Sequence, residues 1–316
     1  MVARVFIDGA AGTTGLEIRE RLAGRRDLAL IQISEAQRKD AGARRAALNE
    51  ADLVILCLPD EAAREAVSLI ENPAVRVIDA STAHRVAPGW VFGFPELEPD
   101  GYEKIAAAKR VTNPGCYSTG FLALVRPLVR AGLLPADYPY TVNAVSGYSG
   151  GGKAMIAEFE NAEAPEYTRT VVRSYALTLA HKHIPEMTER GGLAHPPVFS
   201  PSVGRYYRGM LVDVPLQLWA MANRPTPAEL HATLAEAYRG RSLVEVAGPA
   251  EVAQLKTLDA EALAGTNRIR LHVFGNEKTG QARLVALLDN LGKGASGAAV
   301  QNLNVMLGLP ETMGLV

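Results

Sequence analysis

The chain has 316 residues, of which 48% are hydrophobic and 21% are charged, and its formal net charge is −1. This length fits two domains, each able to bury an apolar core of its own. A near-neutral chain without a long basic run argues against a nucleic-acid partner. No apolar run approaches the roughly 20 residues that a membrane span needs. We therefore expect a small-molecule partner.

The N-terminal stretch MVARVFIDGAAG begins a strand almost at once and lacks the features of a signal peptide. We therefore expect a cytoplasmic protein. The two cysteines, Cys57 and Cys116, lie far apart in the sequence. This spacing predicts two free thiols rather than a disulfide framework or a zinc cluster.

Strands and helices alternate through the first quarter of the chain. Strand-like runs at 4–8, 28–33, 52–58 and 74–79 are separated by helical runs at 16–24, 41–48 and 61–70. Such alternation is typical of a parallel, doubly wound sheet of the Rossmann type. We predict an α/β domain over residues 1–115.

Three glycines, Gly9, Gly12 and Gly15, lie in DGAAGTTG between the first strand and the first helix. Their spacing differs from G-x-G-x-x-G by one inserted position. Small residues there still let the backbone approach a pyrophosphate at a helix N-terminus. We predict a dinucleotide site at this turn; the alternative is a tight strand-to-helix turn that binds no ligand.

The end of the second predicted strand bears on the choice between NAD and NADP, because an acidic residue there accepts hydrogen bonds from the NAD ribose. The run is QISEAQRK, in which Ser34 ends the strand, Arg38 and Lys39 follow, and Glu35 favours NAD. A hydroxyl and two cations suit a 2′-phosphate, so we predict NADP(H). The alternative is that Arg38 and Lys39 belong to a solvated loop.

Cys116 lies in NPGCYSTGFLALV, directly before apolar residues at helical spacing. A helix N-terminus lowers the pKa of a thiol, and its N–H groups can hold an oxyanion. We predict a nucleophile at Cys116; the alternative is a small packed thiol at a domain junction. Cys57 lies in the apolar strand LVILCLP and is expected in the core.

The segment SGYSGGGKA follows a predicted strand, and Gly147, Gly152 and Lys153 satisfy G-x-x-x-x-G-K. Ala154 replaces the Ser or Thr that would hold magnesium, and the segment falls after the predicted dinucleotide unit. We therefore expect a loop that binds a substrate phosphate rather than an NTPase site. A flexible connector is the alternative.

Two histidines, His181 and His183, lie in HKHIPE, where an extended backbone would project both onto one face. Either imidazole suits an acid/base that works with Cys116, and the residues alone do not rank them. A structural role for both is an alternative. A zinc site needs at least a third ligand besides the two histidines. Glu186 and His195 are near in the sequence, but nothing fixes their geometry, so we expect no metal.

The second half of the chain has a different pattern. Strand-like runs at 140–146, 198–203, 209–215, 268–275 and 281–288, with a helix at 227–238, predict an α+β domain with a mixed or antiparallel sheet over 116–293. The last segment, SGAAVQNLNVMLGL, is helical and has an Ala and Val face. We expect it to return to the first domain, which then comprises 1–115 and 294–316.

Together these segments resemble the N-acetyl-gamma-glutamyl-phosphate reductases, the arginine-biosynthesis family of the semialdehyde dehydrogenase superfamily, and their shorter type in particular. The resemblance runs essentially end to end. Its most specific part is NPGCY together with H-x-H-x-P-E. It also includes GAAGTTG, CLPDEA, DASTAHR, FGFPEL, VSGYSGGGK and KGASGAAVQNLNVMLGL.

The resemblance implies an NADP-dependent acyl-phosphate reductase, which converts N-acetyl-L-glutamyl 5-phosphate into N-acetyl-L-glutamate 5-semialdehyde and phosphate through a cysteine thioester. It implies Cys116 as the nucleophile and His181 as the acid/base. The residues expected to bind substrate are Arg85, Asn113, Ser146, Gly147, Tyr175, His183 and Glu186. Those expected to bind the dinucleotide are Gly9, Ala11, Gly12, Thr13, Thr14, Gly15, Ser34, Arg38, Pro59, Ser81 and Asn302.

The apolar strands of the second domain, with the family precedent, imply a homo-oligomer, either a homodimer or a homotetramer. Two other functions stay open. One is another semialdehyde dehydrogenase, such as the aspartate semialdehyde enzyme, with the same chemistry on a different acyl phosphate. The other is a non-catalytic NADP-binding protein in which Cys116 only packs.

Overall fold

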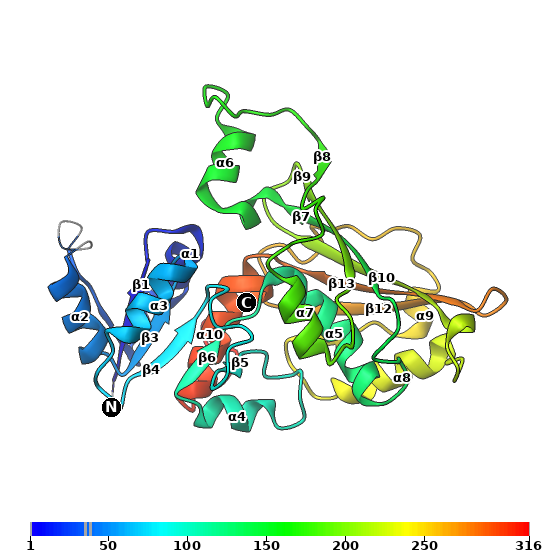
Figure 1. The fold of residues 1–316 in the computed structure, drawn as a ribbon, viewed down its shortest axis with the longest axis horizontal. Coiled ribbons are helices and arrows are strands. Elements are labelled where there is room, and N and C mark those ends of the chain that lie inside the picture. Colours follow the sequence, from blue (N-terminus) through cyan, green and yellow to red (C-terminus); the bar gives the residue numbers. More distant parts are fainter. Residues whose placement is uncertain (1, 35–36, 38–39, 316) are drawn as a thin grey trace. The chain divides into compact units, whose positions relative to one another are not determined.

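The computed structural model describes residues 2–34, 37 and 40–315 (Figure 1). The chain forms two compact units. Unit 1 comprises Met1–Pro95, Asp100–Pro114 and Ala295–Val316, and unit 2 comprises Glu96–Pro99 and Gly115–Gly294.

Unit 1 contains a six-stranded parallel sheet in the order β2-β1-β3-β4-β6-β5. The strands are β1 (Ala3–Asp8), β2 (Leu28–Ile31), β3 (Leu53–Leu56), β4 (Arg76–Asp79), β5 (Val91–Phe92) and β6 (Arg110–Thr112). The predicted doubly wound sheet is confirmed. The two strands that the sequence did not reveal, β5 and β6, are too short to show a periodic pattern.

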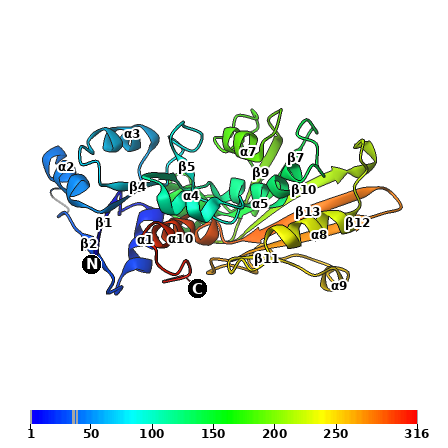
Figure 2. The same cartoon turned by 90° about the horizontal axis from the view of Figure 1, so that it is seen from below.

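Helices cover both faces of this sheet (Figures 1 and 2). They are α1 (Thr13–Leu22), α2 (Ala41–Glu50), α3 (Asp60–Ser68), α4 (Gly101–Ala107) and α10 (Gly297–Met306). The C-terminal helix α10 packs with α1 and α4 on one face, and α2 and α3 pack on the other.

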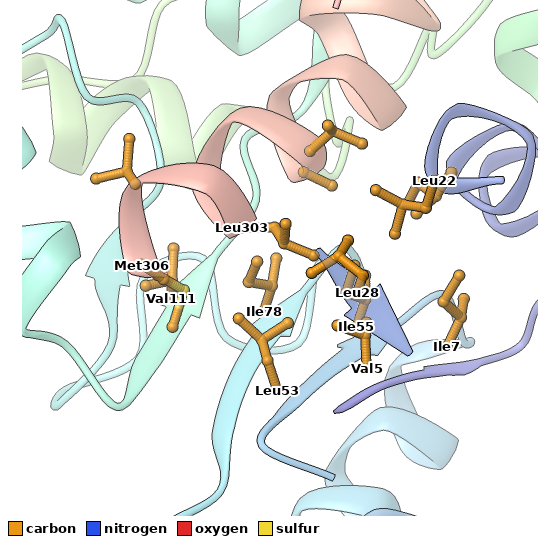
Figure 3. Packing of buried hydrophobic residues seen from close by; sticks show 14 of the residues in the cluster. Val5, Ile7, Leu22, Leu28, Leu53, Ile55, Ile78, Val111, Leu303 and Met306 are labelled. Carbon is orange, nitrogen blue, oxygen red and sulfur yellow. The ribbon is translucent and has the colours of Figure 1, made fainter. Parts of the chain in front are cut away.

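Successive strand residues point to opposite faces, and helices cover both faces, which explains why the central residues of these strands are apolar on both sides. Val5 and Ile7 of β1 join the cluster under α1 and α10, whereas Phe6 joins the cluster under α2 and α3. Figure 3 shows the first cluster, with Leu303 of α10 over Ile78 of β4. Each fully buried aliphatic side chain of this kind contributes about 1.5–3 kcal/mol to the free energy of folding, relative to an exposed one.

Unit 2 contains a seven-stranded mixed sheet in the order β11-β12-β13-β10-β7-β9-β8. The strands are β7 (Thr141–Gly147), β8 (Val172–Ser174), β9 (Val198–Gly204), β10 (Met210–Gln217), β11 (Val244–Val246), β12 (Ile269–Asn276) and β13 (Gln281–Leu288). The β7–β9 and β11–β12 pairs are parallel, and the other pairs are antiparallel. The predicted mixed sheet is confirmed.

The helices of unit 2 are α5 (Cys116–Arg130), α6 (Gly152–Glu160), α7 (Ile184–Gly191), α8 (Pro227–Ala237) and α9 (Pro249–Val252). Short 3₁₀ turns occur at Tyr148–Gly151 and Leu218–Ala220, and a π-helix spans Gly292–Ser296. Helix α5 packs on β10 and β13 and against α7 and α8. Its apolar face is fully buried, which fixes the position of its first residue, Cys116.

Candidate active site

Cys116 is the first residue of α5, and Gly115 is the N-cap in an extended conformation, with φ −77° and ψ 147°. Within the described part of the chain, no side chain caps this helix. The N–H groups of its first turn and the positive end of its dipole are therefore directed at the region of the thiol. This is the setting that favours a thiolate.

Glu186 holds the turn before the cysteine. Its Oε1 accepts a hydrogen bond from the Gly115 N–H at 2.8 Å, and the side chain is buried. Glu186 lies in α7, so this bond ties α7 to the start of α5. One oxygen of the carboxylate is thus committed to the backbone, and the predicted contact of Glu186 with substrate stays a prediction.

The two histidines lie side by side, with ring centroids 4.7 Å apart. The extended segment that we expected here is wrong: His183 is the N-cap of α7 with near-helical angles, φ −87° and ψ −10°, and a turn precedes it. The turn lets the His183 N–H donate to Nδ1 of His181 at 3.1 Å. His183 is buried, whereas His181 is half-buried and more open to a ligand.

Aromatic rings surround His181. Tyr117, Tyr175 and Phe199 lie 5.8, 5.7 and 5.0 Å from it, centroid to centroid. The Tyr175 hydroxyl donates to that of Tyr117 at 3.1 Å, which in turn donates to the carbonyl of Ser202 at 3.3 Å. Burial raises the pKa of Tyr175 to about 12, and the negative charge of a Cys116 thiolate adds to the rise. Tyr175 therefore stays protonated at neutral pH and lies within electrostatic reach of the sulfur.

The glycine-rich segment after β7 does not form a phosphate cradle at its start. The N–H groups of Gly147, Tyr148 and Ser149 donate to the carbonyls at 209, 206 and 207, at 2.9, 3.0 and 3.0 Å. A P-loop needs such N–H groups turned toward the phosphate. Ser146 is buried, and its hydroxyl donates to the carbonyl of Gly147 at 3.2 Å. Binding of a substrate phosphate by Ser146 and Gly147 stays a prediction.

In unit 1, the fold itself demands two of the three turn glycines. Gly9 has φ +88°, and a Cβ there would lie 2.3 Å from the carbonyl oxygen of Cys57. A Cβ at Gly15 would lie 2.5 Å from the Gly9 oxygen. At Gly12 the nearest atom would be 3.5 Å away, an ordinary contact. Packing therefore does not require glycine at position 12, whereas close approach of a pyrophosphate would.

Two buried oxygen atoms in unit 1 fit a dinucleotide. Oγ1 of Thr13, the first residue of α1, and Oδ1 of Asn302 have no hydrogen-bond partner among the residues that the structure describes. Buried polar atoms are normally paired, so each is suited to a ligand. The α1 N-terminus beside Ala11 and Thr14 likewise has no side-chain cap within the described ranges. Nδ2 of Asn302 donates to Gly93 and Asn113, at 2.8 and 3.1 Å.

The region after β2 is described only in part. The Ser34 hydroxyl donates to Oε1 of Gln37 at 2.8 Å. Arg38, which we predicted to bind the 2′-phosphate, lies outside the described residues, as do Glu35 and Lys39. The predicted roles of Ser34 and Arg38 therefore stay predictions.

Sequence reasoning missed Asp8, which ends β1 directly before the glycine turn. Burial raises the pKa of Asp8, while the Arg44 guanidinium, which donates to its Oδ2 at 2.7 Å, opposes that rise. The signal was a carboxylate placed between an apolar strand and Gly9. Because the carboxyl ends of parallel strands face the ligand, this ion pair belongs to the same edge as the turn.

Sequence reasoning also missed Asp79 and His84 in DASTAHR, after β4. The fully buried Asp79 carboxylate accepts bonds from the Ser81 N–H and hydroxyl, at 2.9 and 2.8 Å, and pairs with Nδ1 of His84 at 2.6 Å. His84 stacks on Trp90, with centroids 4.1 Å apart. These contacts order the turn that carries Ser81 and the buried Arg85. Pro59, which lies between β3 and α3, is the N-cap of α3.

None of the helices in residues 2–34, 37 and 40–315 is both long and apolar enough to span a membrane. In the same residues, no three His, Cys, Asp or Glu side chains gather as metal ligands would.

Known proteins match the chain over nearly its whole length. Residues 4–105 match the semialdehyde dehydrogenase NAD binding domain, and residues 116–290 match the semialdehyde dehydrogenase dimerisation domain. Relatives named N-acetyl-gamma-glutamyl-phosphate reductase include one from Brucella ovis, 56% identical, and one from Nostoc sp., reductase 2, 53% identical. These alignments cover 98% and 99% of this chain, and 100% and 99% of the relatives.

Solved structures share the fold. Aspartate semialdehyde dehydrogenase II from Vibrio cholerae aligns with a TM-score of 0.71 at 15% identity, covering 98% of this chain and 99% of that one. The Candida albicans enzyme with NADP aligns with a TM-score of 0.65 at 13% identity, covering 97% and 99%. The sequence relatives, at far higher identity, place the protein more narrowly. The chain belongs to the semialdehyde dehydrogenase superfamily and, within it, to the N-acetyl-gamma-glutamyl-phosphate reductases.

Proposed function

We propose that the protein reduces N-acetyl-L-glutamyl 5-phosphate to N-acetyl-L-glutamate 5-semialdehyde with release of phosphate, using NADPH, as a step of arginine biosynthesis. The names of relatives that are 53–56% identical over 98–99% of the chain support this substrate. The structural observation that carries the chemistry is a thiol at an uncapped helix start, followed directly by Tyr117, whose ring contacts His181.

The first half of the reaction uses the sulfur of Cys116. Its thiolate attacks the acyl carbon, forming a C–S bond, and the C–O bond to phosphate then breaks to leave a thioester. N–H groups of the first turn of α5 are placed to donate to the oxyanion that develops in between. Covalent capture replaces one difficult step by two easier ones.

The second half restores the sulfur. NADPH, when bound, would supply the hydride that reduces the thioester carbon. An imidazolium would give a proton to the oxyanion that forms, and the same imidazole would take this proton back as the C–S bond breaks, which releases the aldehyde and the thiolate. We assign this proton transfer to His181, and to its Nε2 atom, because Nδ1 already accepts the His183 N–H.

The chain's own residues would hold both the dinucleotide and the substrate. Gly12, Thr13 and Asn302 would bind the dinucleotide. Two observations support this: packing does not require glycine at position 12, and the two buried oxygens have no protein partner among the described residues. Preference for NADP rests on the sequence at Ser34 and Arg38. Arg85, which is buried and directly follows His84 in the sequence, is our candidate for an anionic group of the substrate.

We also propose that the protein is a homo-oligomer, with the homodimer as its basic form. The dimerisation-domain match over 116–290 supports this assembly. A cytoplasmic location stays a prediction from the sequence.

One assay separates the proposed function from its rivals. Phosphate-dependent reduction of NADP is measured with N-acetylglutamate semialdehyde and with aspartate semialdehyde. We expect turnover with the first and at most a trace with the second; the reverse preference would make the protein an aspartate-type enzyme, and no turnover with either would favour a non-catalytic NADP-binding protein.

Replacement of the nucleophile tests the covalent route. Cys116→Ser is expected to abolish turnover and to leave NADPH binding, measured by fluorescence titration, near the wild-type value. Wild-type turnover by this variant would remove the thioester from the mechanism.

A further inference from the structure

We infer that Gly294, anchored by the buried Lys293–Glu96 ion pair, is a positioning residue for the Cys116 thiol. The inference rests on the proposed function, since it takes Cys116 as the nucleophile. Lys293 and Gly294 belong to the segment KGASG, and Glu96 belongs to the segment FGFPEL. The reaction described above uses neither segment.

Gly294 lies so close to Cys116 that only glycine fits at position 294. A Cβ added at Gly294 would lie 2.8 Å from Cβ of Cys116, 3.3 Å from its Cα and 3.0 Å from the carbonyl oxygen of Asp289. Real Cβ contacts are essentially never below 3.0 Å. The backbone at position 294 therefore acts as a support against the cysteine, and a methyl group there would displace the residue that carries the sulfur.

A π-helical turn brings Gly294 to this place. The turn spans Gly292–Ser296, and the Gly294 N–H bonds to the carbonyl of Asp289, five residues earlier, at 3.0 Å. The buried Asp289 carboxylate fixes its start by accepting the N–H groups of Leu291 and Gly292, at 2.8 and 3.1 Å. Single π turns are rare in proteins, and those that do occur are frequently found at functional sites.

The neighbouring lysine anchors the turn. Nζ of Lys293 lies 2.6 Å from Oε1 of Glu96, and the two residues are 1% and 3% exposed. A buried ion pair adds little stability over an apolar pair of similar volume, because both charges lose their hydration. The ion pair does favour one position of the lysine, because the buried ammonium is stable only beside the carboxylate. Lys293 thereby sets the position of Gly294 against Cys116.

The two thiols of the chain allow a direct test that does not depend on turnover. Burial raises the pKa of the Cys57 thiol to about 12. At about pH 8 Cys57 stays protonated and unreactive, because the thiolate is the nucleophile. The rate of alkylation by iodoacetamide then reports Cys116, and peptide mass spectrometry identifies the labelled residue.

The first variant is Gly294→Ala. We expect slower alkylation of Cys116 and a fall in kcat of about 10²-fold, as follows from misplacing a reacting group by about 1 Å, with NADPH binding retained. The matched control is Gly248→Ala, where an added Cβ would meet no described atom within 4 Å. Alkylation and kcat of Gly294→Ala within twofold of the control would overturn the inference.

The second set of variants tests whether the Lys293–Glu96 ion pair anchors the turn. Lys293→Met alone leaves the Glu96 carboxylate buried without its cation and should lower the unfolding temperature. Lys293→Met combined with Glu96→Leu removes both charges and should recover the unfolding temperature, while alkylation of Cys116 and kcat stay reduced. Full recovery of kcat in the double variant would show that the pair only stabilises the fold, which contradicts an anchoring role.

Failure of this inference is distinguishable from failure of the proposed function. If Cys116→Ser retains turnover, the thioester route is wrong whatever happens at Gly294. If Cys116→Ser is inactive and Gly294→Ala behaves like its control, the function stands and the positioning role is removed.

Discussion

His181 and His183 have different surroundings, and these assign them different tasks. His183 is 4% exposed and is the N-cap of α7, so its ring is part of the packing. His181 is half-buried, and the backbone holds its ring through Nδ1. The sequence alone could not rank the two, because both rings were predicted on one face.

The histidine pair yields a kinetic prediction. His181→Asn should lower kcat by the roughly 10²–10⁴-fold that a lost acid/base costs, with little change in the unfolding temperature. His183→Asn should lower the unfolding temperature and affect kcat less. Steady-state kinetics and thermal melts of both variants check this. If His183→Asn alone causes the large kinetic loss, the two assignments are exchanged.

His272 of β12 yields a prediction about stability and pH. The residue is 1% exposed, and desolvation lowers its pKa from the ordinary 6.5. Below that pH the unfolded chain takes up a proton that the folded chain refuses, so this contribution to stability is present above 6.5 and is lost as the pH falls.

The test compares unfolding temperatures at neutral and mildly acidic pH. His272→Phe should lose less stability on acidification than the wild type, since the phenyl ring cannot titrate. His195→Asn, at an exposed position, is the control and should show the wild-type pH dependence. An unchanged acid sensitivity in His272→Phe would contradict the prediction.

Among the elements, the glycine turn before α1 combines a requirement of folding with one of binding. Gly15→Ala places a methyl group 2.5 Å from the Gly9 oxygen and should lower the unfolding temperature. Gly12→Ala makes only an ordinary contact at 3.5 Å and should leave stability unchanged while weakening NADPH binding. Thermal melts and fluorescence titration separate the two effects. Normal NADPH affinity in Gly12→Ala would reduce the turn to a purely structural role.

The segment HKHIPE shows where element prediction failed. We expected an extended chain, but a turn leads into α7, with Pro185 in the first turn of the helix and His183 as its N-cap. Proline is favoured at the first helical positions because its fixed φ suits a helix and its missing N–H costs nothing there. That proline was the available signal. The two rings still lie side by side, because the turn brings them together.

For the whole molecule, one segment of unit 2 carries a run of exposed apolar side chains. Val171, Val172, Leu177 and Leu179 are 70%, 56%, 80% and 58% exposed, and they lie on or just beside β8, the edge strand of the mixed sheet. Clustered exposed apolar groups mark association sites more often than scattered ones do. The same stretch leads into His181, so association would also affect the site.

Paired charges on this segment test the proposed homodimer. If the segment is its interface, Leu177→Asp combined with Leu179→Asp should shift the protein from dimer to monomer in light scattering after size-exclusion chromatography. Trp219→Ser, which alters an exposed apolar side chain outside the segment, is the control and should stay dimeric. A dimeric double variant would place the interface on another surface.

The sequence by itself determined the two sheets, the glycine turn, the cysteine at a helix start and the family. Periodicity and short motifs specify these features, because they depend on residues close together in the chain. Only the tertiary structure revealed the Glu186–Gly115 bond, the Lys293–Glu96 pair and the contact of Gly294 with Cys116. Those contacts join segments tens to hundreds of residues apart, and only the packing of helices on the finished sheet decides which of them meet.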